Sequence, residues 1–265
     1  MEILLTNDDG IHAPGLWALY KRLSLKHRTN VVASDRERSA VGFGITLNEP
    51  LRIKKIQMDA AGSGYAVTGT PVDCVKLALL ELFETRPDMV ISGINPGANV
   101  GVNINYSGTV SAAREAALFG IPSIAVSITG NESMRFVEAA LFIEVLVEKV
   151  NRRHLPFGTT LNVNIPNLPL REVAGVRITR QCLLRSNEQF EKRRDPRNRD
   201  YYWPGGELSA AGEQPDADGA ILERKYISIT PVKCDMTDDD FIEDLRQWEF
   251  HGDLETANRF AGSER

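Results

Sequence analysis

Two adjacent carboxylates, Asp8 and Asp9, follow directly after the first apolar run of the chain, residues 3–5. That run predicts a short buried strand, and ligands of open parallel sheets bind beyond the carboxyl ends of such strands. Neighbouring carboxylates repel each other unless one is protonated or a cation lies between them. Their oxygen atoms suit Mg²⁺ or Mn²⁺ as ligands. The simpler alternative is an Asp-Gly turn in which one aspartate caps the next helix.

The same position argues against other kinds of site. A dinucleotide-binding fold has a G-x-G-x-x-G segment after its first strand, where two carboxylates would repel the pyrophosphate. A phosphorylated-aspartate mechanism also fits poorly, because side chains adjacent in sequence diverge and do not flank one phosphorus atom. The sequence has no P-loop, H-E-x-x-H or G-x-S-x-G pattern.

Further polar loops follow other apolar runs. Asn95 and Asn99 come after the predicted strand 89–91, and Ser39 comes after the predicted strand 31–33. Amide and hydroxyl oxygens at such places can bind a cation or a phosphate. Taken alone, each of these residues is equally explained by hydrogen bonds to its own loop backbone.

A fourth polar segment, Tyr106-Ser107-Gly108-Thr109, lies at the start of a predicted helix, residues 109–119. Hydroxyl groups and unpaired N–H groups at a helix N-terminus form an anion site. The alternative is that Ser107 or Thr109 merely caps the helix. Because all four loops follow strand-like runs, we expect them to meet at one edge of one sheet.

The elements that would position these loops predict an α/β fold. Apolar runs at 3–5, 31–33, 89–91 and 124–128 are typical of buried parallel strands, and residues 51–67 indicate a strand pair around Gly62-Ser63-Gly64. Helices are expected from Pro14, Thr70, Thr109 and Ser133. Alternation of strands and helices predicts a mostly parallel sheet with helices on both faces.

The pattern changes from about residue 155. Residues 161–165 alternate apolar and polar side chains, which indicates a half-solvated strand. We place a boundary near residue 170, between a compact core (1–170) and a β-rich arm with a last helix (171–265). Such an arm is too thin to bury its own core, which predicts self-association.

Two segments of the arm have alternative interpretations. Residues 185–200 are rich in both charges, which favours a solvated hairpin or a subunit contact over a phosphate-binding patch. The aromatic run 201–203 packs a turn or an interface, or else stacks on a base. Residues 238–240, three aspartates, are expected to cap the last helix and not to bind a second metal.

Composition narrows the class of protein. The chain has 265 residues, 42% hydrophobic and 25% charged, with a net charge of −5. A mildly acidic chain is a poor candidate for binding nucleic-acid polymers or anionic membranes. Its three cysteines are far apart in sequence, and no apolar stretch is long enough to span a bilayer. We therefore expect a cytoplasmic protein with free thiols.

Several motifs, taken together and in order, resemble the stationary-phase survival protein SurE family. They are Asn7-Asp8-Asp9-Gly10, Ser34-Asp35-x-x-x-x-Ser39, Gly69-Thr70-Pro71-x-Asp73-Cys74-Val75, Ser92-Gly93-Ile94-Asn95-x-Gly97-x-Asn99-x-Gly101 and Tyr106-Ser107-Gly108-Thr109-Val110-x-Ala112-Ala113. The resemblance is strong over residues 1–130. It continues more loosely through residues 162–166, 201–203 and 229–231.

The resemblance implies a Rossmann-like fold and a metal-dependent phosphatase. Members of the family hydrolyse nucleoside 5′- and 3′-monophosphates, and some also trim short polyphosphate. Their C-terminal arm exchanges between subunits of dimers or tetramers. The tail beyond about residue 240 matches no part of this pattern.

The resemblance also assigns roles to individual residues. It implies one Mg²⁺ or Mn²⁺ per subunit, bound by Asp8, Asp9, Ser39 and Asn95, with Asp8 and Asp9 acting in catalysis through a metal-bound water. The physical mechanism that follows has the helix N-terminus at Ser107, Gly108 and Thr109, with the amide of Asn99, hold the non-bridging oxygens of the substrate phosphate. Two alternatives stay open: a nucleotide-binding module without turnover, and an oligomeric interaction protein whose arm is the functional part.

Overall fold

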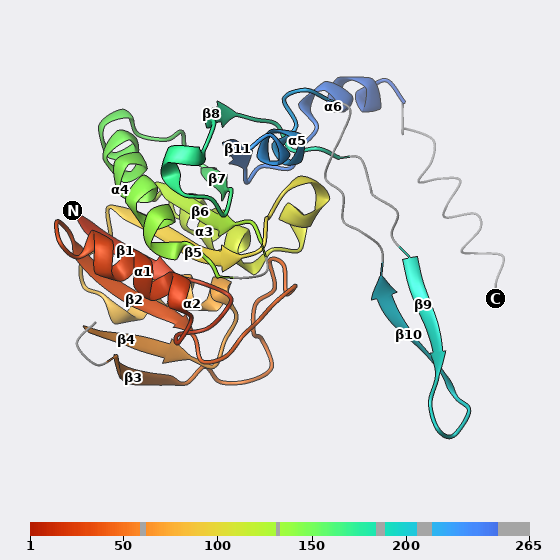
Figure 1. Cartoon of the computed structure of the whole chain (residues 1–265), viewed down its shortest axis with the longest axis horizontal. Coiled ribbons are helices and arrows are strands. Elements are labelled where there is room, and N and C mark those ends of the chain that lie inside the picture. Colours follow the sequence, from red (N-terminus) through yellow and green to blue (C-terminus); the bar gives the residue numbers. More distant parts are fainter. Residues whose placement is uncertain (59–61, 131–132, 184–188, 206–213, 249–265) are drawn as a thin grey trace. The chain divides into compact units, whose positions relative to one another are not determined.

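A nine-stranded, mostly parallel sheet dominates the part of the chain that the computed structural model describes, which is residues 1–58, 62–130, 133–183, 189–205 and 214–248 (Figure 1). The strand order is β3-β4-β2-β1-β5-β6-β7-β11-β8, and only the β3–β4 and β7–β11 pairs are antiparallel. The strands are β1 (Glu2–Thr6), β2 (Arg28–Ser34), β3 (Ile53–Met58), β4 (Gly62–Val67), β5 (Met89–Pro96), β6 (Ser123–Ile128), β7 (Thr159–Ile165), β8 (Gly175–Ile178) and β11 (Tyr226–Lys233).

Helices cover both faces of this sheet, as the α/β prediction requires. Apolar residues of α1 and α4 form one core with the sheet, and those of α2 and α3 form another on the opposite face. The helices are α1 (Pro14–Leu23), α2 (Pro71–Leu77), α3 (Gly108–Leu118), α4 (Phe136–Arg153) and α5 (Asp218–Glu223). Three short helical turns complete the set: η2 (Ala78–Leu82), η3 (Gly101–Asn105) and η4 (Leu170–Glu172).

The order of the strands reverses beside β1. The chain proceeds from β1 through β2 to β4 on one side, then returns to β5 on the other side of β1. A crevice forms at such a reversal, outside the carboxyl ends of the strands, because the two crossover connections leave in opposite directions. The loops that follow β1, β2 and β5 therefore meet at one edge of the sheet.

Local signals for the ends of two helices are confirmed. Pro14 is the first residue of α1, and Thr70 caps α2. The Thr70 hydroxyl accepts a hydrogen bond from the N–H of Asp73, whose carboxylate in turn accepts from the N–H of Thr70. This reciprocal pair satisfies two N–H groups that the helix itself cannot pair.

Other expectations need correction. Gly62 and Gly64 lie within β4, not in the turn before it. α4 begins at Phe136, three residues after Ser133. The strand at 161–165 is not half-solvated: β7 lies between β6 and β11, and both Asn162 and Asn164 are fully buried.

Beyond the sheet, β9 (Gln189–Arg194) and β10 (Asp200–Gly205) form an antiparallel hairpin, and every residue of these two strands is exposed. The chain divides into two compact units, Met1–Cys234 and Asp235–Arg265, each with contacts mostly within itself. The second unit contains α6 (Asp239–Arg246), whose N-cap is Asp238, as the three aspartates predicted. Among the described residues, no helix is both long and apolar enough to cross a membrane.

Candidate active site at the carboxyl ends of β1, β2 and β5

A tight turn after β1 positions the two aspartates. The side-chain amide of Asn7 donates to the carbonyl of Gly10 at 3.0 Å, and Gly10 has φ +98°, a conformation that glycine adopts without strain. The carbonyl of Asp8 accepts from the N–H of Arg38 at 2.7 Å. The turn after β1 is thus joined to the loop after β2 that carries Ser39.

The carboxylate of Asp8 lies against the N-terminus of α3. It is 6% exposed, and the Thr109 hydroxyl donates a hydrogen bond to it. A Cβ atom placed on Gly108 would be 2.8 Å from Cβ of Asp8 and 2.9 Å from its Oδ2, so only glycine leaves room for this approach. The Ser107 hydroxyl accepts from the N–H of Val110, so Ser107 is the N-cap of the helix.

Burial and mutual repulsion act on both aspartates. Burial raises the pKa of Asp8, against the hydrogen bonds from Thr109 that lower it. Burial, then the charges of Asp8 and Glu37, raise the pKa of Asp9 to about 7. Within the described chain, Oδ2 of Asp9 is buried without a hydrogen-bond partner. A divalent cation would stabilise the ionised form of two such neighbouring carboxylates and would give the unpartnered oxygen a ligand.

Ser39 and Asn95 supply neutral oxygens to the same place. Ser39 is exposed, and its hydroxyl donates to Glu37 at 2.5 Å. The amide nitrogen of Asn95 donates to the carbonyl of Gly97 at 2.7 Å, so its Oδ1 is the atom with which it would bind a cation.

One cavity of about 670 Å³ brings most of the expected residues together. Its lining includes Asp8, Ser39 and Asn95 from the expected metal set, and Asn99 and Ser107 from the expected phosphate set. Three further expected residues, Asp9, Gly108 and Thr109, are not part of that lining. Asp9 is next to Asp8 in sequence, and Gly108 and Thr109 contact Asp8 at the start of α3.

The family of the chain follows from comparison with known proteins. A family model described as Survival protein SurE matches residues 3–188, which is well over half of the sequence. The chain belongs to the SurE family.

SurE relatives match nearly the whole length. A protein of Desulfatibacillum aliphaticivorans named 5′-nucleotidase SurE is 56% identical over 248 residues, covering 94% of this chain and 98% of the relative. One of the same name from Syntrophobacter fumaroxidans is 47% identical, covering 94% and 99%. The crystal structure of the SurE protein from Aquifex aeolicus has a TM-score of 0.83 at 40% identity, covering 94% of this chain and 100% of that chain.

In this SurE chain the structure adds two site-supporting residues that the sequence analysis did not single out. Asn164 accepts from the N–H of Asn99 at 2.8 Å and donates to its carbonyl at 3.0 Å, and Asn162 donates to the same carbonyl at 2.8 Å. The amide nitrogen of Asn99 donates to Ser127 at 2.8 Å. The two β7 asparagines hold the main chain of Asn99 as a neighbouring strand would. The alternation of asparagines in residues 161–165 was the available signal, but it was assigned to solvent.

Proposed function

We propose that this chain hydrolyses nucleoside monophosphates, at the 5′ or 3′ position, to nucleoside and phosphate. The proposal rests on the cavity at the reversal of the strand order. Residues expected to bind the metal and residues expected to bind the phosphate line this same cavity: Asp8, Ser39, Asn95, Asn99 and Ser107. The relatives named 5′-nucleotidase SurE support the substrate class. Short polyphosphate is a second substrate that the same phosphate-binding groups would accept.

One divalent cation, Mg²⁺ or Mn²⁺, fits the residues present. Asp8 and Asp9 would hold it through carboxylate oxygens, with Ser39 and Asn95 supplying neutral ones. The unpartnered Oδ2 of Asp9, noted above for the described residues, supports this assignment. Such a cation, when bound, polarises a phosphoryl oxygen and lowers the pKa of a bound water.

The remaining groups would orient the phosphate. The start of α3 would offer the main-chain N–H of Gly108, which lies outside the helical hydrogen-bond pattern, beside the hydroxyl of Ser107. Thr109 donates to Asp8 through both its hydroxyl and its N–H, so it would act on the phosphate by holding that carboxylate in place. Asn99 would face the same oxygens from a main chain that the β7 asparagines hold in place. Fixed dipoles of this kind favour the charge that develops on the phosphoryl oxygens in the transition state.

The test is phosphate release from AMP in the presence of Mn²⁺, Mg²⁺ or EDTA. We expect Asp8→Asn and Asp9→Asn to lower kcat by at least about 100-fold, because each removes a carboxylate from the cation. Glu84→Gln, which removes an exposed carboxylate before β5 and outside the cavity lining, should leave kcat within about two-fold. Circular dichroism checks that each variant is folded.

Two outcomes would contradict the proposal. Full activity in EDTA, or in either aspartate variant, would remove the metal-site assignment. Binding of AMP with Mn²⁺ but without phosphate release would instead identify a nucleotide-binding module.

Assembly and location are further parts of the proposal. We infer that the chain forms homodimers or tetramers through the arm of residues 171–265, and that residues 1–170 form the catalytic core. The exposed aromatic side chains of the hairpin support this.

The free cysteines Cys74, Cys182 and Cys234 favour the reducing cytoplasm. The acidic net charge argues against partners such as nucleic-acid polymers or membranes.

A further inference from the structure

The loop between Asn95 and η3 is anchored at every second residue, each time by a different part of the fold. The N–H of Gly97 donates to the carbonyl of Ile128 at the end of β6. Asn99 is held by the asparagines of β7, as described above. The third anchor, at Gly101, comes from residues on either side of the β9–β10 hairpin in sequence.

Asp218, the first residue of α5, makes the main contact at this third anchor. Its carboxylate is fully buried and accepts from the N–H of Gly101 at 2.8 Å, from Gly219 at 2.9 Å and from Cys182 at 3.4 Å. All three partners are donors, so the carboxylate, which only accepts, matches them. One carboxylate oxygen accepts the hydrogen bond from Gly101, and the other accepts those from Cys182 and Gly219.

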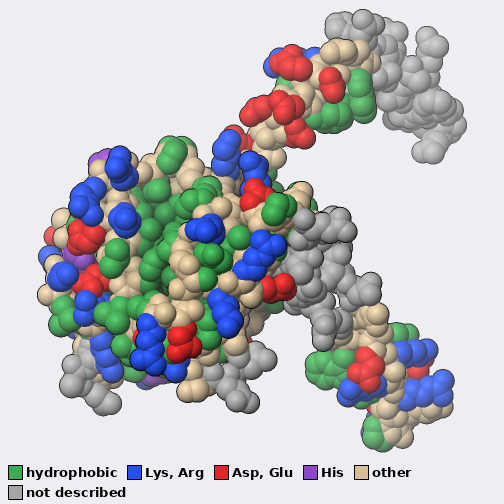
Figure 2. Space-filling view, turned by 45° about the horizontal axis from the view of Figure 1, so that its top comes forward, with side chains coloured by type: hydrophobic (Ala, Val, Ile, Leu, Met, Phe, Trp, Pro, Cys, Tyr) green, Lys and Arg blue, Asp and Glu red, His purple; other side chains and the backbone are tan. Residues whose placement is uncertain are grey.

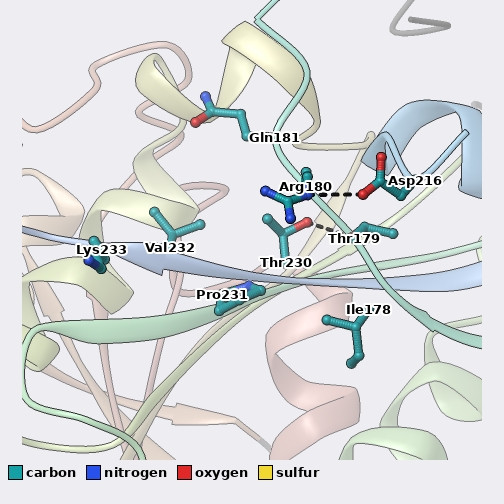
Figure 3. Close-up of a pocket in the computed structure, with 9 residues that line it drawn as sticks. All are labelled: Ile178, Thr179, Arg180, Gln181, Asp216, Thr230, Pro231, Val232 and Lys233. Carbon is teal, nitrogen blue, oxygen red and sulfur yellow. Dashed lines mark hydrogen bonds and ion pairs between the residues drawn. The ribbon is translucent and has the colours of Figure 1, made fainter. Parts of the chain in front are cut away.

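The segments that enter and leave the hairpin are joined to each other at this point, which we call the arm base: residues 180–182 and 216–218. The N–H of Arg180 donates to the carbonyl of Asp216, and the N–H of Asp218 donates to the carbonyl of Arg180. Figure 3 shows the ion pair between the Arg180 and Asp216 side chains, with Gln181 extending away from it. The Gln181 side chain donates to the carbonyl of Gly101 at 2.9 Å.

The arm base therefore holds both the N–H and the carbonyl of Gly101, where the phosphate-site segment begins. η3 starts at Gly101, and the N–H of Ser107 donates to the carbonyl of Asn103 within that turn. A displacement of Gly101 would thus move the turn that presents Ser107 to the cavity. Asn95 precedes the Gly97 anchor, and Asp8 contacts α3 beyond Ser107, at Gly108 and Thr109. Val110 and Ala113 pack the start of that helix into the core, so the expected metal ligands would follow this movement less than Ser107 does.

Resting on the function proposed above, we propose that Asp218 is a positioning residue for the phosphate site: it fastens Gly101 to the base of the hairpin arm and so fixes the turn that carries Ser107. Asp218 does not contact substrate in this arrangement. Its effect is on the orientation of phosphate-binding groups, and the arm and the site are mechanically joined through it.

Asp218→Asn tests this selectively. An amide has one acceptor oxygen, which would serve the two donors of the arm base, Cys182 and Gly219, and leave an NH₂ group facing the N–H of Gly101. Asp216→Asn is the matched control, because Asp216 lies in the same arm base, pairs with the exposed Arg180 side chain and forms no hydrogen bond or ion pair with residues 95–101, all of which the structure describes. Gln181→Met is a second test of the same anchor. It keeps the length of the side chain but removes the hydrogen bond that the segment before the hairpin donates to the carbonyl of Gly101.

The measurements are binding of Mn²⁺, then of inorganic phosphate and AMP in saturating Mn²⁺, by calorimetry on the full chain, together with KM and kcat for AMP. We expect Asp218→Asn to weaken phosphate binding and raise KM at least five-fold while Mn²⁺ affinity stays within two-fold. Gln181→Met should weaken phosphate binding two- to five-fold, and Asp216→Asn should match the wild type. A residue that only stabilises the fold would lower the unfolding temperature without changing this ratio of phosphate to metal affinity.

Wild-type phosphate affinity in folded Asp218→Asn overturns the proposal, as does an equal loss in Asp216→Asn. If Asp218→Asn does not fold, Gln181→Met decides, and wild-type affinity in that variant overturns it. If the wild-type protein binds AMP without releasing phosphate, the proposed function fails, but the binding comparison still tests the role of Asp218.

Discussion

At the scale of single residues, the fold places Asp9 where its ionised form is disfavoured. The pKa of Asp9 is raised to about 7 by burial and by the charges of Asp8 and Glu37, from an ordinary value of 3.8. Because the folded value lies above the unfolded one, the folded state binds the extra proton between about pH 7 and pH 4. In the metal-free protein, Asp9 therefore destabilises the fold above pH 7 and ceases to do so as the pH falls.

We expect the free energy of unfolding of EDTA-treated protein to fall by on the order of 2 to 3 kcal/mol more from pH 5 to pH 8 in the wild type than in Asp9→Asn. Urea unfolding at the two pH values measures this. Glu84→Gln, which removes an exposed carboxylate before β5, should retain the wild-type difference. Identical pH dependence in wild type and Asp9→Asn would contradict the raised pKa. Saturating Mn²⁺ should abolish the effect, since it stabilises the ionised form.

At the scale of elements, the start of α3 and the turn after β1 depend on each other. The missing side chain of Gly108 allows the Asp8 carboxylate to reach Thr109, and the helix N-terminus favours that negative charge. The geometry of the proposed metal site is therefore determined partly by a helix from another part of the chain.

Gly108→Ala should displace Asp8, because the added Cβ would approach Cβ and Oδ2 of Asp8 to less than 3.0 Å. We expect Mn²⁺ affinity and kcat to fall about ten-fold or more, while the helix itself gains up to about 1 kcal/mol of propensity. Calorimetry and phosphate release measure the first effects, and thermal unfolding measures the last. Ser24→Ala is the control, since Ser24 is exposed at the end of α1 and lies outside the cavity lining. An unchanged Mn²⁺ affinity in Gly108→Ala would show that Asp8 tolerates the contact.

At the scale of the whole molecule, the hairpin lacks a core of its own. Within the described chain β9 and β10 pair only with each other, and hydrophobic side chains lie on the surface of the hairpin (Figure 2, lower right). The exposed aromatic residues of the two strands are Phe190, Tyr201, Tyr202 and Trp203. A two-stranded ribbon is at best marginally stable in water, and this supports the proposal that a second copy of the chain covers the hairpin.

We expect the wild-type protein to be dimeric or larger at micromolar concentration by light scattering. Phe190 and Tyr202 lie on one face of the hairpin and Tyr201 and Trp203 on the other, by the register of the strands. We expect the molar mass of the assembly to fall in at least one of two double variants, Phe190→Ser/Tyr202→Ser and Tyr201→Ser/Trp203→Ser. Arg197→Ser, in the connecting turn, should not. A monomeric wild type, or unchanged mass in both double variants, would rule out assembly through the hairpin.

Features that depend on neighbours along the chain were predictable from the sequence. Apolar runs and capping residues such as Pro14 and Thr70 specify elements locally, and alternation of strands and helices specifies a parallel sheet with helices on both faces. Because loops after parallel strands emerge at one edge, the meeting of Asp8, Ser39 and Asn95 in one cavity was also predictable.

Contacts between buried polar groups from distant parts of the chain were not predictable in this way, because they depend on the three-dimensional arrangement of the strands. Asn162 and Asn164 alternate like solvated residues, yet β7 lies inside the sheet and turns them to Asn99. Asp218 is 117 residues from Gly101 in sequence, and no local pattern links them. A buried polar side chain needs a partner, but its partner depends on the strand order and on chain crossings that the local sequence pattern does not encode.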